Sequence, residues 1–185
     1  NGSIGYNNSD YLEEGTDTLI SLPDESLREF RIKQNNIRDR QLYATASWAL
    51  DEGANRNAHL NMRFDHYRFE LDQTNHVIPT GGTERDDRLN QNYRNDKWEI
   101  GGDVTRPLLG GGVKLVGLYR TASRHNHDDS FNIIDADVLG GFVQELRTRT
   151  DEAVIRSTWA HPNLGGWSFE TGIEGAYNRL ASDVN

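Results

Sequence analysis

The sequence of 185 residues contains no cysteine and only 4 prolines. Without cysteine the chain has no disulfide framework, no thiolate zinc site and no cysteine nucleophile. Its 18 glycines, together with 4 Trp, 7 Tyr and 6 Phe, are not the composition of a disordered linker. We therefore expect a folded chain that uses neither disulfides nor thiol chemistry.

Positive charge and long apolar segments are also scarce. The 20 Lys and Arg residues are outnumbered by 29 Asp and Glu residues, which gives a formal net charge of −9. No nucleic-acid partner is expected, because phosphate contacts need clustered Lys and Arg. No segment approaches the roughly 18 apolar residues of a membrane-spanning helix. Hydrophobic residues make up 35% of the chain, against roughly 45–50% in soluble domains when glycine is counted, so an ordinary globular core is not expected.

The two ends of the sequence carry no targeting segment. The chain begins at Asn1, without an initiator methionine and without the charged and apolar segments of a signal peptide. It ends at Asn185, shortly after a segment of alternating polarity. We interpret the chain as an excised or processed piece of a longer protein.

The dominant pattern is an alternation of apolar and polar residues with a period of two. Between Leu42 and Leu50 every even position is apolar. Further alternating segments are 58–71, 98–105, 153–159 and 167–178. This period is typical of strands with one apolar face, whereas an amphipathic helix repeats every 3.6 residues. The sequence therefore predicts an antiparallel all-β fold.

The phase of the alternation changes inside one of these segments. Even positions are apolar from Leu60 to Phe64, and odd positions are apolar from Tyr67 to Leu71. A slip of one residue in an alternating segment is typical of a β-bulge. We expect a bulge near Asp65-His66.

The connections between the strands alternate in length. Short glycine-bearing turns are expected around Gly53, Gly111 and Gly165, and two long polar stretches, 73–96 and 123–150, lie between them. Strict alternation places all long loops at one end of the strands, which is the layout of an outer-membrane β-barrel. Strands of about ten to twelve residues, tilted by ~40°, would rise about 25–30 Å, near the height of the apolar band of such barrels. We predict a meander of about six to eight strands that forms a section of a barrel.

Three tryptophans lie close to the predicted short turns, where an aromatic girdle would meet the membrane interface: Trp48, Trp159 and Trp167. The alternative is that they fill the core of a β-sandwich. Residues 41–180 are interpreted as repeated β-hairpins. Residues 1–40 are interpreted as a strand lead-in, although the charged segment Leu27–Arg40 also fits a short surface helix.

Some of these segments are similar to a known family. The segments 98–108, 114–120 and 167–178 resemble barrel strands of TonB-dependent outer-membrane receptors in strand style and turn chemistry. The resemblance spans about Gln41 to Leu180 and implies a Gram-negative transporter whose barrel of about 22 strands is plugged by an N-terminal domain and energised through TonB. No plug, TonB-contacting box or terminal aromatic strand is recognisable. The chain therefore resembles an internal section of such a barrel.

Few residues suggest a chemical site. The cluster His125, His127, Asp128 and Asp129 has side chains that ligate divalent cations, but polar clusters in long loops usually serve solvation. Gly110–Gly112 lacks the Lys-Ser/Thr pair of a phosphate loop and is interpreted as a turn. No Gly-x-Ser-x-Gly elbow occurs. We expect no enzymatic activity and no cofactor.

Two functional hypotheses remain. In the first, the chain is part of an outer-membrane TonB-dependent receptor that takes up a small ligand such as a siderophore or another nutrient, with polar strand faces lining the lumen and residues 73–96 and 123–150 meeting the ligand. In the second, it is a soluble all-β binding or structural module. In either case the isolated chain is expected to self-associate through unpaired sheet edges or to curl into a soluble body, because open edges template pairing.

Overall fold

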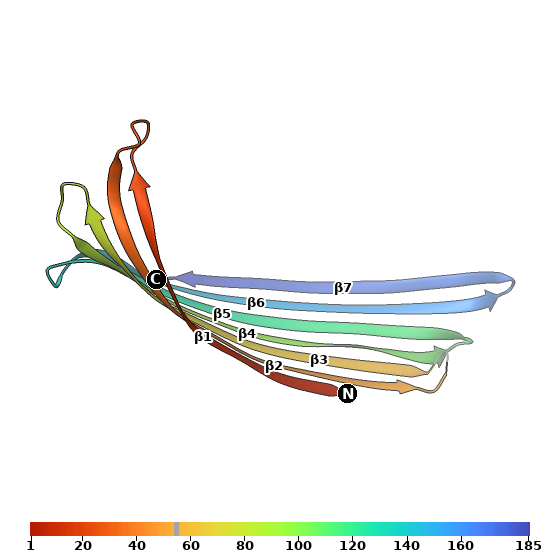
Figure 1. The fold of residues 1–185 in the computed structure, drawn as a ribbon. Helices are drawn as coiled ribbons and strands as arrows, with labels where there is room; N and C mark the ends of the chain where they lie inside the picture. Colours follow the sequence, from red (N-terminus) through yellow and green to blue (C-terminus); the bar gives the residue numbers. More distant parts are fainter. Residues whose placement is uncertain (54–55) are drawn as a thin grey trace.

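The computed structural model describes residues 1–53 and 56–185, which form one antiparallel sheet of seven strands in the order β1-β2-β3-β4-β5-β6-β7 (Figure 1). The strands are β1 (Gly2–Ile20), β2 (Leu27–Asp51), β3 (Asn57–Pro79), β4 (Arg85–Leu108), β5 (Gly111–Ile134), β6 (Asp137–Leu164) and β7 (Trp167–Val184). The prediction of an all-β antiparallel meander is confirmed. The sheet is not closed, since β1 pairs only with β2 and β7 only with β6.

Tight turns lie at one end of the sheet. Leu109 and Gly110 have φ angles of 50° and 78°, and Gly165 and Gly166 have φ angles of 65° and 93°. Two consecutive residues with positive φ are typical of type I′ hairpin turns, whose twist matches that of the strands. The predicted turns near Gly111 and Gly165 are therefore present. The predicted turn near Gly53 includes residues 54–55, which lie outside the described residues.

The prediction of two long loops is wrong. Residues 73–96 and 123–150 continue the strands, and only residues 80–84 and 135–136 connect them at the far end. The strands are correspondingly longer than predicted, with 23 residues in β3 and 24 in β4. These segments lack the alternation that marks strands because neither of their faces is consistently apolar, while backbone pairing continues along them.

Residues 1–40 form β1 and the first half of β2, so the strand interpretation is confirmed and the helix alternative for Leu27–Arg40 is wrong. Pairing with β1 on one side and β3 on the other holds this charged segment extended. Cross-strand pairing overrides its weak local preference, as is common for strands.

The predicted bulge near Asp65-His66 is also wrong. Pairing runs without a shift from Phe64↔Ala44 through Tyr67↔Gln41, and β3 pairs with β4 equally regularly there. The change of phase in the sequence is a change of face. Apolar side chains point to one side of β3 up to Phe64 and to the other side from Tyr67 onward.

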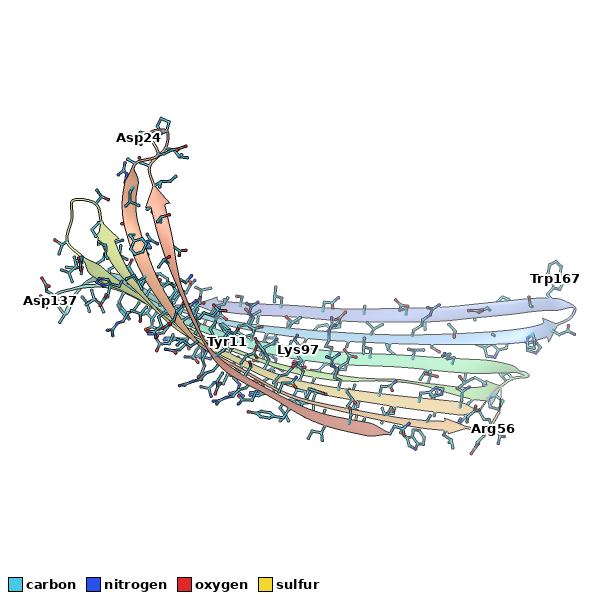
Figure 2. The ribbon with its side chains drawn as sticks, in the orientation of Figure 1. Tyr11, Asp24, Arg56, Lys97, Asp137 and Trp167 are labelled. Atoms are coloured by element: carbon cyan, nitrogen blue, oxygen red, sulfur yellow. The ribbon has the colours of Figure 1, made fainter. Side chains whose placement is uncertain are left out.

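The sheet has almost no core. The buried hydrophobic side chains among the described residues are Ile37 and Val77. Val77 lies between Arg31 and Arg85 on the neighbouring strands, and Arg85 reaches over it to Glu29 at 3.0 Å. Side chains project from both surfaces along the whole length of the sheet (Figure 2). Among the described residues, none belongs to a helix that is long and apolar enough to cross a membrane.

Candidate functional site: two unlike faces of the sheet

The two faces of the sheet differ sharply in chemistry. Residues paired across neighbouring strands point to the same side, and side chains along one strand alternate. We call the side that carries Phe64 and Trp98 the belt face, and the other side the opposite face. On the half of the sheet nearer the tight turns, the belt face is apolar and the opposite face is charged.

The apolar half of the belt face forms one continuous surface, which we call the apolar belt. Its larger members are Ile4, Tyr6, Leu42, Trp48, Leu60, Met62, Phe64, Trp98, Ile100, Val104, Val113, Leu115, Tyr119, Ile155, Trp159, Phe169, Ile173 and Tyr177. Many of these are exposed, including Ile155 at 65% and Ile173 at 76%. A contiguous exposed apolar surface of this kind typically marks a contact with another protein or with a membrane.

The three tryptophans singled out in the sequence lie on the belt face at the tight-turn end. Trp159 donates a hydrogen bond from Nε1 to the backbone oxygen of Leu108 at 2.9 Å, and its ring centroid lies 5.9 Å from that of Phe169. Trp48 is 54% exposed. Trp167 is 79% exposed and projects at the β6–β7 turn (Figure 2). All three point outward, so they do not form a sandwich core.

A second set of aromatic side chains ends the apolar belt on the side away from the tight turns: Tyr6, Phe64, Trp98, Tyr119 and Tyr177. The rings of Phe64 and Trp98 are 4.4 Å apart. Sequence reasoning missed this set because the five residues come from separate hairpins. Phe64 is the last apolar residue before the change of phase, Trp98 opens segment 98–105 and Tyr177 ends the apolar positions of 167–178, whereas Tyr6 and Tyr119 lie in no alternating segment.

The opposite face of the same half of the sheet carries ion pairs. Arg120 pairs with Glu152 at 2.6 Å and Arg156 with Glu174 at 3.9 Å. Asp103 lies between His59, at 3.2 Å, and Lys114, at 3.9 Å. The hollows in this half of the sheet open mainly on this face, one of about 580 Å³ near Lys114 and Glu170 and one of about 440 Å³ near Arg63 and Glu99.

Further from the tight turns, the opposite face carries aromatic rings. Tyr67 and Tyr93 are 5.7 Å apart in an edge-to-face arrangement. The guanidinium of Arg124 lies over the Tyr93 ring, 4.8 Å from its centroid, and the Tyr67 hydroxyl donates to Asp39 at 3.3 Å. Desolvation, reinforced by the Asp39 carboxylate, raises the pKa of Tyr67. The cluster can stack on a planar ligand and offer it a cation.

Comparison with other proteins names no relative. No family model matches the chain, and no curated protein matches it. The chemistry of the two faces is therefore the basis for any functional conclusion.

The candidate metal ligands of β5 do not converge. His125, His127 and Asp129 lie on the belt face and Asp128 on the opposite face. Side chains two apart on a strand are separated by about 7 Å, whereas ligands of one cation lie about 2–2.5 Å from it. His125 instead contacts Glu145 at 2.7 Å, and Asp129 accepts a hydrogen bond from Asn90 at 3.1 Å. Within residues 1–53 and 56–185, no group of three or more such side chains is arranged to hold a metal ion.

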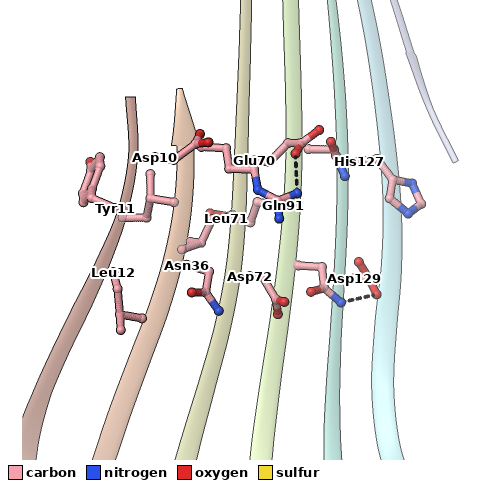
Figure 3. Close-up of a pocket in the computed structure, with 14 residues that line it drawn as sticks. Asp10, Tyr11, Leu12, Asn36, Glu70, Leu71, Asp72, Gln91, His127 and Asp129 are labelled. Atoms are coloured by element: carbon pink, nitrogen blue, oxygen red, sulfur yellow. Dashed lines mark hydrogen bonds and ion pairs between the residues drawn. The ribbon is translucent and has the colours of Figure 1, made fainter. Parts of the chain in front are cut away.

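The distal half of the belt face contains a polar hollow of about 840 Å³ across β1 to β5 (Figure 3). Asp10, Glu70, Asp72 and Asp129 bring carboxylates to it. Arg38 contacts Glu70 at 3.5 Å. This surface carries no apolar band and is suited to water.

Proposed function

We propose that this chain forms a section of the barrel wall of a TonB-dependent receptor in the outer membrane, and that the complete protein takes up a small ligand such as a siderophore or another nutrient. In this proposal the apolar belt contacts lipid, the opposite face lines the lumen, and TonB supplies energy through a plug domain. The role is transport rather than catalysis. The observation that carries the proposal is the exposed apolar belt between two sets of aromatic side chains.

The dimensions of the belt support a membrane-facing role. On β7 its aromatic limits are Phe169 and Tyr177, eight residues apart. Eight residues span about 26 Å of strand, or roughly 20 Å along the membrane normal at a tilt of ~40°, close to the ~25 Å apolar band of outer-membrane barrels. Tryptophan at both limits, joined by tyrosine at the distal one, matches the aromatic belts found at membrane interfaces.

The obliqueness of the distal aromatic limit also supports a barrel wall. The register from β1 to β4 places Tyr6 level with Asp96. Trp98 on β4 therefore lies two residues nearer the tight turns than Tyr6 does. Tyr119 on β5, paired with Ile100, lies two residues further in the same direction. The limit therefore crosses the strands at a slant, as a membrane boundary does when strands tilt.

The opposite face supports a wet interior. Its charged side chains lie directly behind the belt, and the hollows of this half open on it. Tyr67, Tyr93 and Arg124 lie beyond the belt on the same face, where they would meet a ligand entering from the side of the long hairpins. The proposed ligand contact is therefore made by strand residues within 73–96 and 123–150, and their neighbours, rather than by loops.

The absence of cysteine provides a direct experiment. Single cysteines are placed at successive positions from Val113 to Tyr119 of β5, in outer membranes that contain the protein, and labelled with a membrane-impermeant maleimide. We expect little labelling at the belt-face positions 113, 115, 117 and 119 and strong labelling at 114, 116 and 118. Uniform labelling, or recovery of the protein in the soluble fraction, would contradict the proposal and favour a soluble all-β module.

Dependence on TonB needs its own measurement. We expect that cysteines can crosslink the complete protein to the periplasmic domain of TonB. The crosslink should form more efficiently when ligand is present. A protein that inserts in the outer membrane with the alternating labelling pattern but never crosslinks to TonB would be a barrel of another transport class.

A further inference from the structure

A row of basic side chains, four arginines and one histidine, crosses the belt face beyond the apolar belt. It consists of Arg40, Arg68, Arg94, His125 and Arg147, which are directly opposite one another on β2 to β6. Like charges placed opposite on neighbouring strands destabilise a sheet. Negative charge close to the row is therefore needed to offset the repulsion between its members.

The sheet supplies only part of that negative charge. Three carboxylates lie beside the row, and each contacts two basic side chains: Glu70 contacts Arg38 and Arg68, Asp96 contacts Arg94 and His66, and Glu145 contacts Arg147 and His125. Hydrogen bonds from Arg147 and then His125 lower the pKa of Glu145, so this carboxylate stays ionised at neutral pH. Arg40 bonds to the amide of Asn8 at 3.3 Å and has no carboxylate within ion-pair distance among the described residues.

The row borders a hollow of about 500 Å³ on the same face, formed by β4 to β7. Its basic lining on the belt face includes Arg94, His125, Arg147 and Arg149. Asp96 and Asp183 also line it, so three arginines of the belt face meet two carboxylates there. The side chains of Arg94 and Arg147 are 61% exposed and that of Arg149 is 65% exposed, which leaves N–H donors free for a further acceptor.

The position of the hollow relative to the apolar belt identifies the depth at which it would lie. Arg94 and Trp98 are on the same face of β4, four residues apart. If the aromatic side chains mark the membrane interface, the hollow lies at the level of lipid headgroups, on the side of the long hairpins. Anionic headgroups attract cationic side chains placed there by roughly 1 kcal/mol each, a factor of about five.

We propose that this hollow and the adjoining arginine row bind the phosphate groups of anionic lipids, an inference that rests on the proposed membrane position of the belt. The guanidinium groups donate hydrogen bonds to phosphate oxygens while the acyl chains of the same lipid cover the apolar belt. A lipid fits better than a free phosphate because hollow and belt are continuous on one face. Anionic lipid also supplies the negative charge that the arginine row lacks.

Tryptophan quenching by brominated lipids tests both proposals separately. The complete protein is reconstituted in vesicles of equal parts phosphatidylcholine and phosphatidylglycerol, in which one of the two lipids has brominated acyl chains. One variant keeps only Trp98 and another keeps only Trp48, with the remaining tryptophans changed to Phe. Trp98 reports the end of the belt next to the arginines, and Trp48 reports the end next to the tight turns.

We expect brominated phosphatidylglycerol to be enriched roughly fivefold over phosphatidylcholine around Trp98 and not around Trp48. The triple change Arg94→Gln, Arg147→Gln and Arg149→Gln should bring this enrichment close to one. The matched control is Arg63→Gln, Arg120→Gln and Arg156→Gln, which removes three arginines that each pair with one carboxylate on the opposite face. The control should keep the enrichment, and raised salt should reduce it in both the unchanged chain and the control.

The outcomes are distinct. Equal quenching of Trp98 by the two brominated lipids overturns the lipid site and leaves the membrane position of the belt intact. Absence of quenching by either lipid contradicts the proposed function itself. Enrichment that persists in the triple arginine variant also overturns the site, because other positive charges of the protein must then attract the anionic lipid.

Discussion

At the scale of single residues, the turn between β5 and β6 contains a backbone conformation that its sequence does not favour. Asp135 and Ala136 both have positive φ, 49° and 73°, as a type I′ turn requires. Alanine in this conformation costs roughly 1 kcal/mol because its Cβ crowds the backbone. Ala136→Gly, which creates the favoured Asp-Gly pair, should stabilise this hairpin by about 1 kcal/mol.

The measurement is hydrogen exchange of the β5–β6 backbone amides near the turn, which should slow by roughly fivefold. The control is Gly110→Ala, at φ 78° in the β4–β5 turn. That change should speed exchange, because it introduces the strain that the first change removes. Faster exchange in Ala136→Gly would show that the turn has a different conformation.

A second residue-scale prediction concerns His76 at the tip of the β3–β4 hairpin. The hydrogen bond to Asp86, at 2.9 Å, raises the pKa of His76 above its ordinary value of 6.5, and Glu84, at 3.3 Å, adds to the effect. A raised pKa means that the protonated form is favoured in the folded hairpin. The stabilisation that protonated His76 gives to the folded hairpin is therefore complete below pH 6.5. It is lost as the pH rises through the raised pKa of His76.

Titration of the His76 ring protons by NMR should give a midpoint above 6.5. Asp86→Asn should move this midpoint down, because it removes the main hydrogen-bonding partner. A midpoint at or below 6.5 in the unchanged chain would mean that the pair does not form in solution.

At the scale of elements, the apolar belt was readable from the sequence and the long hairpins were not. In 42–50 and 167–178 one face is apolar and the other polar, so strands and their common face follow from alternation. In stretches 73–96 and 123–150 neither face is consistently apolar, so the alternation is absent although strand pairing continues. Gly81, with a φ of 80°, was a usable turn signal in the first stretch, whereas Asp135–Ala136 in the second lacks glycine.

Some of the candidate sites could likewise be predicted from the sequence and others could not. Trp48, Trp159 and Trp167 were placed on one side because each belongs to an alternating segment or follows a short turn. The arginine row was not predictable, since it depends on the register between five strands, and a slip of one residue would turn its members to opposite faces. The arrangement of the His125 cluster was not predictable either, because alternate residues of a strand point to opposite faces whereas a loop could bring the same side chains together.

Two neighbouring residues of β5 allow a prediction about the faces. Leu115 lies on the belt face and is 42% exposed, and Val116 lies on the opposite face and is 38% exposed. Leu115→Arg should destabilise the membrane-inserted protein by about 2–4 kcal/mol, because it puts a charge in lipid. Val116→Arg, at nearly equal exposure, should change stability by less than about 1 kcal/mol, because it meets the wet face.

Urea unfolding of the protein in lipid vesicles provides the measurement, with the two variants compared in the same lipid. Equal destabilisation by the two variants would show that the faces do not differ in environment. A larger effect of Val116→Arg would assign lipid to the charged face, contrary to the proposed function.

At the scale of the whole molecule, the sheet is incomplete in itself. β1 and β7 each pair on one side only, so both edges present unpaired backbone groups over 19 and 18 residues. In lipid such edges are untenable, and in water they template pairing with another chain. The five intervening strands separate β1 from β7 in the bent, open sheet (Figure 1), so the two edges are not paired with each other in this structure.

We therefore predict that the isolated chain self-associates. In detergent-free buffer both the apolar belt and the edges drive association, and light scattering should give a mass above that of the 21.0 kDa monomer. Detergent covers the apolar belt but cannot replace the backbone hydrogen bonds between strand edges. Edge-to-edge oligomers should therefore persist above the critical micelle concentration. A β-rich monomer in detergent would show that the edges are satisfied by a curled sheet, and a monomer with random-coil circular dichroism would show that the strands need their missing neighbours to form. Persistence in detergent is thus the result that separates edge pairing from simple hydrophobic aggregation, because only backbone pairing survives once the apolar belt is covered.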